Sequence, residues 1–187
     1  SPDIIERLLD HGELSRQARD AGFKAIVIKC HQMGTADRVY FVRKSVPGIE
    51  AFGSLTLNYA VGGLNPFAVD QAIRYGAKVI WMPTVDALSH AEHYEQKYGK
   101  AGGSGDYATE LRVIGGKSTL YEKDRYKGIC VIDRRGELVP EVEDILNLIA
   151  EANVALSMGH LSLPETEVLI KEAKNVGVKK MFVDHPH

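Results

Sequence analysis

Short apolar segments alternate along the sequence with longer amphipathic stretches, and a glycine or proline separates most of them. The apolar segments run almost without polar interruption, which is typical of strands in a parallel sheet covered on both faces. The unit repeats about every 25 to 30 residues, the size of one strand with its helix. The pattern predicts strands at residues 25–28, 49–57 and 78–82, and two more that end near His160 and His185.

The amphipathic stretches predict helices at residues 12–21, 35–46 and 66–75. A further helix is expected to begin at Pro140, because the apolar residues after it have the i, i+3, i+4, i+7 spacing of one buried face. These residues are Val142, Ile145, Leu146 and Ile149. Ser162 and Glu165 have the spacing of a capping box, and Gly177 is expected to end the helix that they start.

Two segments interrupt this rhythm. Residues 99–127 are rich in glycine, tyrosine and charge and show no period, which predicts a lid or mobile loop. Residues 128–139 hold two short apolar pieces around Gly136, which predicts a small β-hairpin inserted between two units. We interpret neither segment as a domain boundary, so we expect residues 1–187 to form one α/β domain.

Composition excludes several classes of protein. Hydrophobic residues make up 44% and charged residues 26%, as in an ordinary globular protein, and the net charge is -2. The sequence has no basic stripe for nucleic acid and no apolar run near the ~20 residues of a membrane span. Two distant cysteines and no visible signal peptide favour a reducing compartment. We therefore expect a cytoplasmic protein that binds neither nucleic acid nor membrane.

Polar residues at the ends of the predicted strands are the candidates for chemistry, because parallel α/β folds bind ligands outside the carboxyl ends of their strands. These residues are Lys29, His31, Asn58, Thr84, His160 and His185. Three of the seven histidines stand at such positions. Cys30, between Lys29 and His31, would point to the opposite face, which argues against a thiol nucleophile.

His160 and His185 are one unit apart, so their rings are expected on neighbouring strands roughly 4.8 Å apart. Two imidazoles at matching levels can bind one divalent metal, with zinc–nitrogen distances of about 2.0–2.1 Å. A third ligand would have to come from His31, from Lys29 or from residues outside this sequence. Asp184 points away from His185 by alternation, so we expect it to be structural.

The alternative interpretation is that each strand-end histidine makes a structural hydrogen bond. Lys29, in the same way, either reaches solvent or points into a cleft, where it would pair with substrate or, if carbamylated, bind metal. His90 has His93 at i+3 in a stretch of helical character, residues 86–98, which is a metal spacing as well as a solvated face. Because His90 closely follows the strand that ends at Thr84, we take it as a substrate-binding candidate.

A glycine-rich turn from Gly62 to Pro66 enters the helix at residues 66–75. Its amides could hold an anion, but it lacks a phosphate-binding fingerprint. The default interpretation is a tight loop in which Asn65 caps the helix. Asn65 joins Asn58, Thr84 and His90 as the substrate-binding candidates.

Several motifs together resemble a family in the amidohydrolase superfamily of metal-dependent hydrolases. They are Lys29-Cys30-His31, Leu57-Asn58-Tyr59-Ala60-Val61-Gly62-Gly63-Leu64-Asn65-Pro66, Trp81-Met82-Pro83-Thr84, Gly159-His160-Leu161-Ser162 and His185-Pro186. The resemblance covers nearly the whole sequence. It implies a (β/α)8 TIM-like barrel with one or two divalent metals. By order and spacing, His160 and His185 match the superfamily's two later metal-binding histidines, and Lys29 and His31 match a Lys-X-His at the second strand.

The sequence also departs from this pattern. It lacks the superfamily's His-X-His pair, which would lie just upstream of Ser1, and it stops before the last strands and their aspartate. We therefore expect an incomplete barrel, truncated at both ends. Its open strand edges would promote a homo-oligomer.

The function predicted is hydrolysis of a C–N or ester bond in a small polar substrate by metal-activated water. Lys29 and His31 are the catalytic candidates, and His160, His185 and His31 the metal ligands. Zinc is the expected metal, with Mn, Fe or Ni as alternatives. The competing hypotheses are a phosphoesterase or decarboxylase on the same barrel, and a non-catalytic relative that binds a small molecule.

Overall fold

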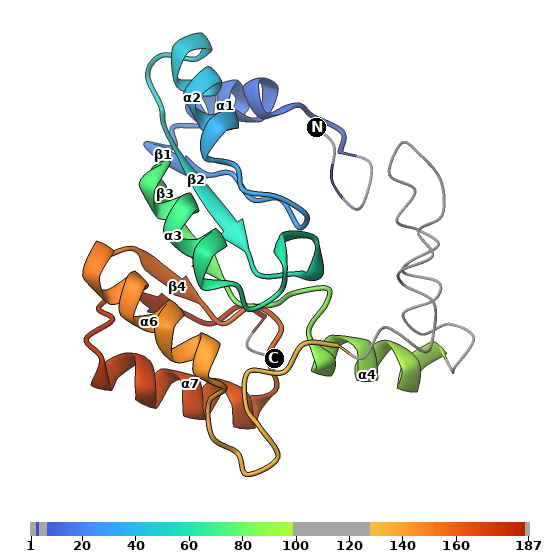
Figure 1. Cartoon of the computed structure of the whole chain (residues 1–187). Helices are drawn as coiled ribbons and strands as arrows, with labels where there is room; N and C mark the ends of the chain where they lie inside the picture. Colours follow the sequence, from blue (N-terminus) through green and yellow to red (C-terminus); the bar gives the residue numbers. More distant parts are fainter. Residues whose placement is uncertain (1–2, 4–6, 99–127, 186–187) are drawn as a thin grey trace.

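The computed structural model describes residue 3, residues 7–98 and residues 128–185, and the side chains of residues 94–98 are not described. Helices and strands alternate throughout this part (Figure 1). The helices are α1 His11–Asp20, α2 Ala36–Ser45, α3 Pro66–Arg74, α4 Leu88–Tyr98, α6 Pro140–Ala152 and α7 Leu163–Asn175, with a short 3-10 helix, η1 Tyr59–Val61. The strands are β1 Ala25–Val27, β2 Glu50–Thr56, β3 Ala77–Trp81, β4 Ala155–Ser157 and β5 Met181–Phe182.

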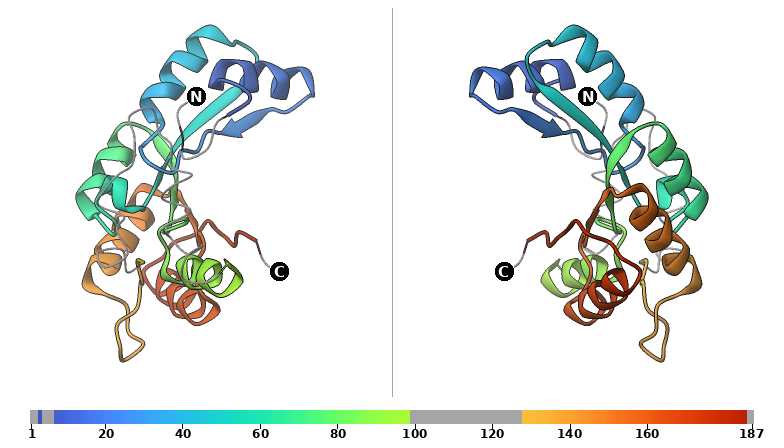
Figure 2. Two further views of the ribbon diagram at one scale, coloured as in Figure 1. Left: turned by 90° about the vertical axis from the view of Figure 1, so that its right-hand side faces the viewer. Right: turned by 90° about the vertical axis from the view of Figure 1, so that its left-hand side faces the viewer.

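The five strands form one parallel sheet in the order β1-β2-β3-β4-β5, so each strand pairs with the next one along the chain. Right-handed crossovers between consecutive neighbours place the connecting helices on one side of a sheet. Figure 2 shows the result, a curved half-barrel with α2, α3 and α6 along its outer side. The predicted parallel α/β fold is confirmed. Helices along the outer side are also what the expected TIM-like barrel requires, while closure into eight strands stays a prediction.

The main core lies between the outer face of the sheet and the helices. Alternate strand residues point into it and are almost fully buried: Leu55, Leu57, Ile80, Met82, Leu156 and Met158. They pack against the buried face of α6 that the sequence predicted and against Val69 and Leu169. Each such side chain contributes about 1.5–3 kcal/mol when it leaves water.

The residues between these core positions face the inner side of the curve. Trp81 of β3 is level with Ser157 of β4, which is level with Phe182 of β5. The Trp81 and Phe182 rings meet edge to face at 5.3 Å, and Val27 of β1 is 42% exposed. The inner side therefore presents apolar side chains that the described residues leave partly uncovered.

Local signals in the sequence set the ends of the helices. Pro140 opens α6, and the left-handed Gly177 (φ 92°) follows the end of α7. At the start of α7, the carboxylate of Glu165 accepts hydrogen bonds from the backbone nitrogen and the hydroxyl of Ser162, at 3.0 and 2.6 Å. Glu165 is 3% exposed and also accepts from the nitrogen of Val131, at 3.0 Å. The predicted start of this helix is confirmed. The Glu165 carboxylate also holds the distant loop that contains Val131.

The predicted hairpin is a tight antiparallel turn. Ile132 and Leu138 form a single bridge, and Gly136 occupies the turn with φ 80°. The nitrogen of Val139 donates to the carbonyl of Val131 at 3.0 Å and that of Asp133 to the carbonyl of Glu137 at 2.8 Å, which agrees with the small hairpin that the sequence predicted. The predicted lid at residues 99–127 lies outside the described residues. None of the described helices is long and apolar enough to cross a membrane.

Gly159 fixes the distance between the ends of β3 and β4. Its φ is +60°, and a Cβ atom there would lie 2.5 Å from the carbonyl oxygen of Pro83 and closer still to that of Met82. Only a residue without a side chain permits this contact and this backbone conformation. The next residue, His160, donates its backbone hydrogen to the same Pro83 oxygen at 2.9 Å.

We expect Gly159→Ala to lower the free energy of unfolding by about 1–3 kcal/mol for the forced overlap, in addition to the cost of a left-handed alanine. Gly136→Ala is the matched control, since Gly136 has φ +80° but nothing within 4 Å of its added Cβ. The control should lose only the left-handed term, about 1–2 kcal/mol. Denaturant unfolding measures both, and equal losses would contradict a close contact at Gly159.

Candidate functional site

Three histidines meet beyond the carboxyl end of the sheet. His160 follows β4 and His185 follows β5, and each lies three residues after a paired position, Ser157 or Phe182. Parallel neighbours advance in step, so the two rings reach matching levels with centroids 5.3 Å apart. His90, in the first turn of α4, stacks on His160 with centroids 4.9 Å apart. The sequence had placed His90 among the substrate-binding residues, and the structure brings it against His160.

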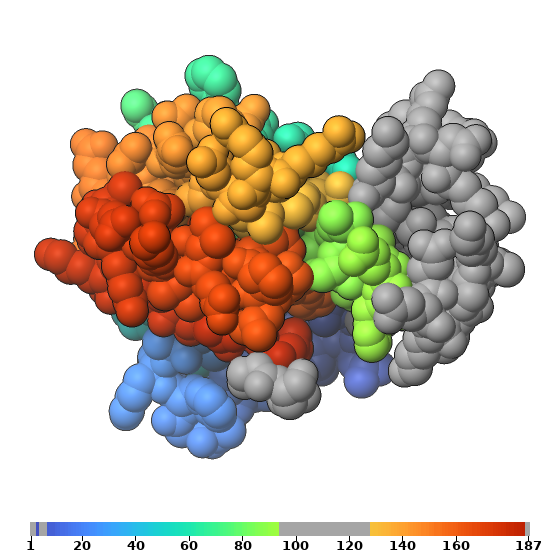
Figure 3. Space-filling model, turned by 90° about the horizontal axis from the view of Figure 1, so that it is seen from below, coloured from blue at the N-terminus to red at the C-terminus, as the bar shows by residue number. Residues whose placement is uncertain are grey.

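The position of α4 depends on contacts to strand ends. The Ser89 hydroxyl donates a short hydrogen bond to the carbonyl oxygen of His160. The nitrogen of Leu88 donates to the carbonyl of Ile129 at 2.9 Å, and Ile129 donates to the carbonyl of Asp86 at 2.7 Å. Figure 3 shows α4 (green) beside the segment that starts at residue 128 (yellow). These bonds hold His90 at the site.

The partly buried rings of His90 and His160 are neutral at physiological pH. Burial lowers the pKa of His160 to about 3, and the charges of His90, His185, Lys29 and His31 act in the same direction. Burial also lowers the pKa of His90 to about 4, with help from His93 and His31. A neutral imidazole can accept a hydrogen bond or bind a metal, which a protonated ring cannot do. Their Nδ1 atoms are 2.9 Å apart.

This pair fits a metal ion in part. Two nitrogens on one zinc, at 2.0–2.1 Å each, lie roughly 3 Å apart, which the His90 and His160 Nδ1 atoms match. Among the residues that the structure describes, however, no three His, Cys, Asp or Glu side chains are arranged to hold an ion. A catalytic zinc usually takes three protein ligands. His185, beside His160, is the nearest described candidate for a third, and the metal role of all three stays a prediction.

His31 lies just beyond the end of β1 and forms an ion pair. Its Nδ1 atom and its backbone nitrogen are each 3.0 Å from the same oxygen of Asp3, Oδ1. The Asp3 side chain is 3% exposed and that of His31 is 16% exposed. Arg7 contacts the other carboxylate oxygen, with Nε 3.2 Å from Oδ2. Oδ1 of Asp3 thus faces His31, and Oδ2 faces Arg7.

Lys29, two residues before His31, points to the inner side of the sheet. Its Nζ atom lies 5.4 Å from the centroid of the Trp81 ring. Burial lowers the pKa of Lys29 to about 8, although the carboxylates of Asp3 and Asp184 act in the opposite direction. The ammonium form of Lys29 therefore still predominates at pH 7, and the fraction of neutral amine grows as the pH approaches 8.

Asp184 ties β5 to β4. Its carboxylate accepts a short hydrogen bond from the Ser157 hydroxyl and a second, at 3.0 Å, from the nitrogen of Gly159. The sequence predicted a structural role for this aspartate, and these contacts provide one. They also keep a negative charge near Lys29.

Asn58 and Thr84, both predicted to bind substrate, are bonded to each other. Asn58 is 1% and Thr84 is 2% exposed. The Asn58 amide nitrogen donates to the carbonyl of His31 at 2.9 Å and to the Thr84 hydroxyl at 3.0 Å, and its oxygen accepts from the Thr84 nitrogen at 2.9 Å. Substrate contact for them stays a prediction. The role that the structure shows is to join the ends of β1, β2 and β3.

Asn65 caps α3. Its side-chain oxygen accepts from the nitrogens of Phe67 and Ala68 at 3.1 and 3.3 Å, and its nitrogen donates to the carbonyl of Val61 at 3.1 Å. The default interpretation of the glycine-rich turn is therefore confirmed, and substrate binding by Asn65 stays a prediction.

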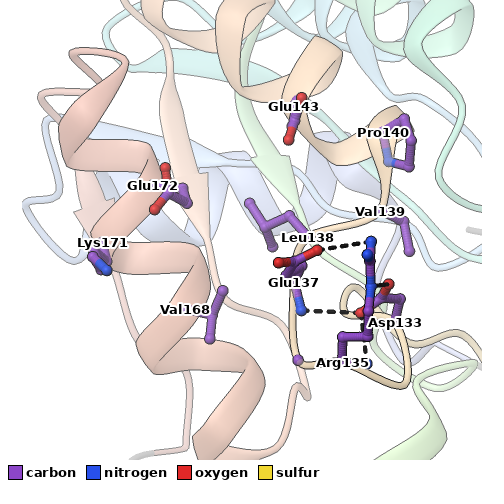
Figure 4. A pocket seen from close by; sticks show the side chains of 11 residues that line it. Asp133, Arg135, Glu137, Leu138, Val139, Pro140, Glu143, Val168, Lys171 and Glu172 are labelled. Carbon is purple, nitrogen blue, oxygen red and sulfur yellow. Dashed lines mark hydrogen bonds and ion pairs between the residues drawn. The ribbon is translucent and has the colours of Figure 1, made fainter.

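A pocket of about 560 Å³ lies elsewhere, between the turn at residues 133–139 and α7 (Figure 4). Apolar residues such as Leu138 and Val168 line it together with charged ones. Arg135 is paired with Asp133 and Glu137 at its rim, at 3.1 and 2.8 Å. None of the predicted site residues lines it. The strand-end histidines and this pocket are separate features.

Asp3 is the residue that sequence reasoning missed. It precedes the first predicted helix and belongs to no periodic pattern, and its partner His31 is 28 positions away. The only signal available in the sequence was an acidic residue upstream of a strand-end histidine, which is too common to be informative.

The chain belongs to the family of unknown function DUF6282, whose family model matches residues 1–187. No curated protein matches the chain. The family description carries no activity, so the resemblance to the amidohydrolase superfamily stays a prediction.

The partly buried His90 and His160 should make the protein acid-sensitive. In the unfolded chain they take up a proton near pH 6.5, whereas in the folded protein they stay neutral until about pH 4 and 3. The unfolded state therefore binds more protons in this window, and the free energy of unfolding should fall as pH drops from about 6.5 to 4. Urea unfolding of chelator-treated protein at several pH values measures the slope.

His160→Gln should make this slope shallower, because glutamine does not titrate. His93→Gln, which changes an exposed histidine of α4, is the control and should change the slope less than His160→Gln, because His93 is only a secondary cause of the lowered His90 pKa, after burial. An unchanged slope in His160→Gln would show that its ring is protonated as readily in the folded protein as in the unfolded chain.

Proposed function

We propose that this DUF6282 protein is a metal-dependent hydrolase that cleaves a C–N or ester bond in a small polar substrate. One observation carries the proposal: the His160 ring contacts the rings of both His90 and His185 beyond the carboxyl ends of parallel strands. This is where α/β enzymes of this type place their chemistry. Burial keeps two of the rings neutral, as a metal ligand requires.

His160, His90 and His185 are the residues that would hold the cation. Imidazole suits zinc first, and Mn, Fe or Ni as alternatives. A bound divalent cation supplies an acidified water and polarises the bond to be cleaved. His31 was also a metal candidate in the sequence, but its Nδ1 atom faces Asp3 at 3.0 Å. We assign its remaining nitrogen, Nε2, to proton transfer.

In this assignment, His31 accepts a proton at Nε2 from the attacking water and returns it to the leaving amine or alcohol. Lys29 binds a negative or carbonyl oxygen of the substrate, since its pKa of about 8 leaves it mostly protonated at pH 7. The Trp81 ring, which meets Phe182 edge to face, lies 5.4 Å from the Lys29 amine and covers one side of it. Asp184 holds β4 and β5 in register. It thereby also positions His160 and His185, which follow these strands.

We propose further that the half-barrel is part of a (β/α)8 barrel. Consecutive parallel strands with helices along the outer side are the arrangement that such barrels repeat eight times. In a closed barrel, inward side chains from all strands pack in layers. The partly exposed Val27 and Phe182, at 42% and 38%, would be covered in this way.

A non-catalytic relative that binds a small molecule is the second candidate. The observation that favours it is that no three His, Cys, Asp or Glu side chains among residues 3, 7–98 and 128–185 are arranged to hold an ion. Such a protein would keep the buried histidines as hydrogen-bonding groups for its ligand and would hold no stoichiometric metal.

Metal analysis of the purified protein separates the two functions. We expect close to one equivalent of a divalent metal, and at least a tenfold weaker affinity in His160→Ala and in His185→Ala, since changes even outside the ligand set cost about 10–100-fold. His90→Ala should behave in the same way. His93→Ala, on the same helix as His90, is the control and should keep its metal.

Two outcomes would contradict the hydrolase. Wild-type protein without stoichiometric metal would favour the binding protein. Unchanged metal content in both His160→Ala and His185→Ala would remove these residues from the site, wherever else the metal binds.

A further inference from the structure

The segment before the first helix contributes a carboxylate to the candidate site. Asp3 and the end of β1 are far apart in sequence, yet the Asp3 side chain is 3% exposed and lies against His31. Its Oδ1 atom accepts the backbone hydrogen of His31 at 3.0 Å and faces the Nδ1 atom of the same residue at 3.0 Å. These two contacts define both the position of the carboxylate and the direction of the ring.

The charge of Asp3 is stabilised in place. Burial by itself would raise the pKa of this carboxyl, but hydrogen bonds from His31 and Arg7 outweigh it and hold the pKa far below its ordinary value. Arg7 contacts Oδ2, whereas Oδ1 faces His31 and also accepts from the Cys30 thiol at 3.8 Å. The carboxylate is therefore ionised across the physiological range and can act only as a hydrogen-bond acceptor.

An acceptor that faces Nδ1 decides which ring nitrogen carries the proton. A neutral imidazole has one N–H and one acceptor nitrogen, and a carboxylate beside Nδ1 favours the N–H on that side. Nε2 is then the acceptor. A histidine that takes a proton from water at Nε2 needs this tautomer before the reaction starts, and a carboxylate partner also stabilises the imidazolium that forms.

We propose that Asp3 is a positioning residue that fixes the His31 ring and its Nδ1–H tautomer, so that Nε2 serves as the proton acceptor of the site. This inference rests on the proposed function for its purpose. The tautomer itself is a property of the protein without metal or substrate, so it can be tested separately.

The experiment is NMR of the 187-residue chain with nitrogen-15-labelled histidine. The sample contains a chelator, and the spectra are recorded at a pH where His31 is neutral. Correlations of the two ring nitrogens with the hydrogens on the ring carbons distinguish the Nδ1–H tautomer from the Nε2–H tautomer. The signals that disappear in His31→Ala are those of His31. Wild type should show Nδ1–H. Asp3→Ala should shift His31 toward Nε2–H, whereas Asp3→Asn should keep Nδ1–H, because its amide oxygen can still accept.

Arg7→Ala is the matched control, because it removes the partner of the other carboxylate oxygen. It should leave the His31 tautomer unchanged. Wild-type His31 with its proton on Nε2, or an Asp3→Ala spectrum identical to wild type, overturns the proposal. Asp3→Asn covers the case in which Asp3→Ala fails to fold: a mixed or Nε2–H tautomer in wild type or in this variant also overturns it.

The result is independent of the metal analysis. If the protein binds no metal but Asp3 controls the tautomer, the proposed hydrolase fails and the positioning role stands. If metal binds at His160 and His185 but the tautomer ignores Asp3, the hydrolase stands and the positioning role fails.

Discussion

The rest of the site depends on how closely β4 approaches β3. Gly159 lies against the carbonyl groups of Met82 and Pro83, in a space and at a φ angle that exclude any side chain. The backbone of His160 then bonds to Pro83, and its carbonyl accepts from Ser89 at the start of α4. One backbone contact therefore fixes the level of His160 relative to the sheet and brings His90 to it. A glycine that looks like a simple turn residue determines the geometry of the histidines.

Charge is divided between two parts of the site. His90 and His160 are partly buried and neutral, so each ring has a nitrogen lone pair at neutral pH. Asp3, Arg7, His31 and Lys29 gather near the end of β1, where an ionised carboxylate offsets the cations. In the function that we propose, the first part would hold the cation, and the second would bind an anionic group or exchange a proton. In that proposal the two parts together bind the polar substrate and transfer a proton through His31.

Prediction from the sequence succeeded where the interactions are local. The helix at Pro140, the capping box of Ser162 and Glu165 and the three N-terminal helices lie within one or two residues of their expected positions. It was weaker for strand-end polar residues. Asn58 and Thr84 have the position of ligand-binding residues. In the structure, however, the Asn58 side chain bonds to the Thr84 hydroxyl, to the Thr84 backbone nitrogen and to the His31 carbonyl. The position of a residue along a strand predicts where its side chain lies in the fold. It does not predict which group the side chain will bond to.

The sequence by itself determined the parallel α/β units, the helix limits and the strand-end positions of His31, His160 and His185. These follow from periodicity and from caps, which act over a few residues. Only the tertiary structure decided that His90 stacks on His160, that Asp3 binds His31 and that the helices lie on one side of the sheet. Those outcomes depend on strand order and on side-chain contacts between residues 28 and 70 positions apart. No local pattern encodes them, because each arises when separate units pack together.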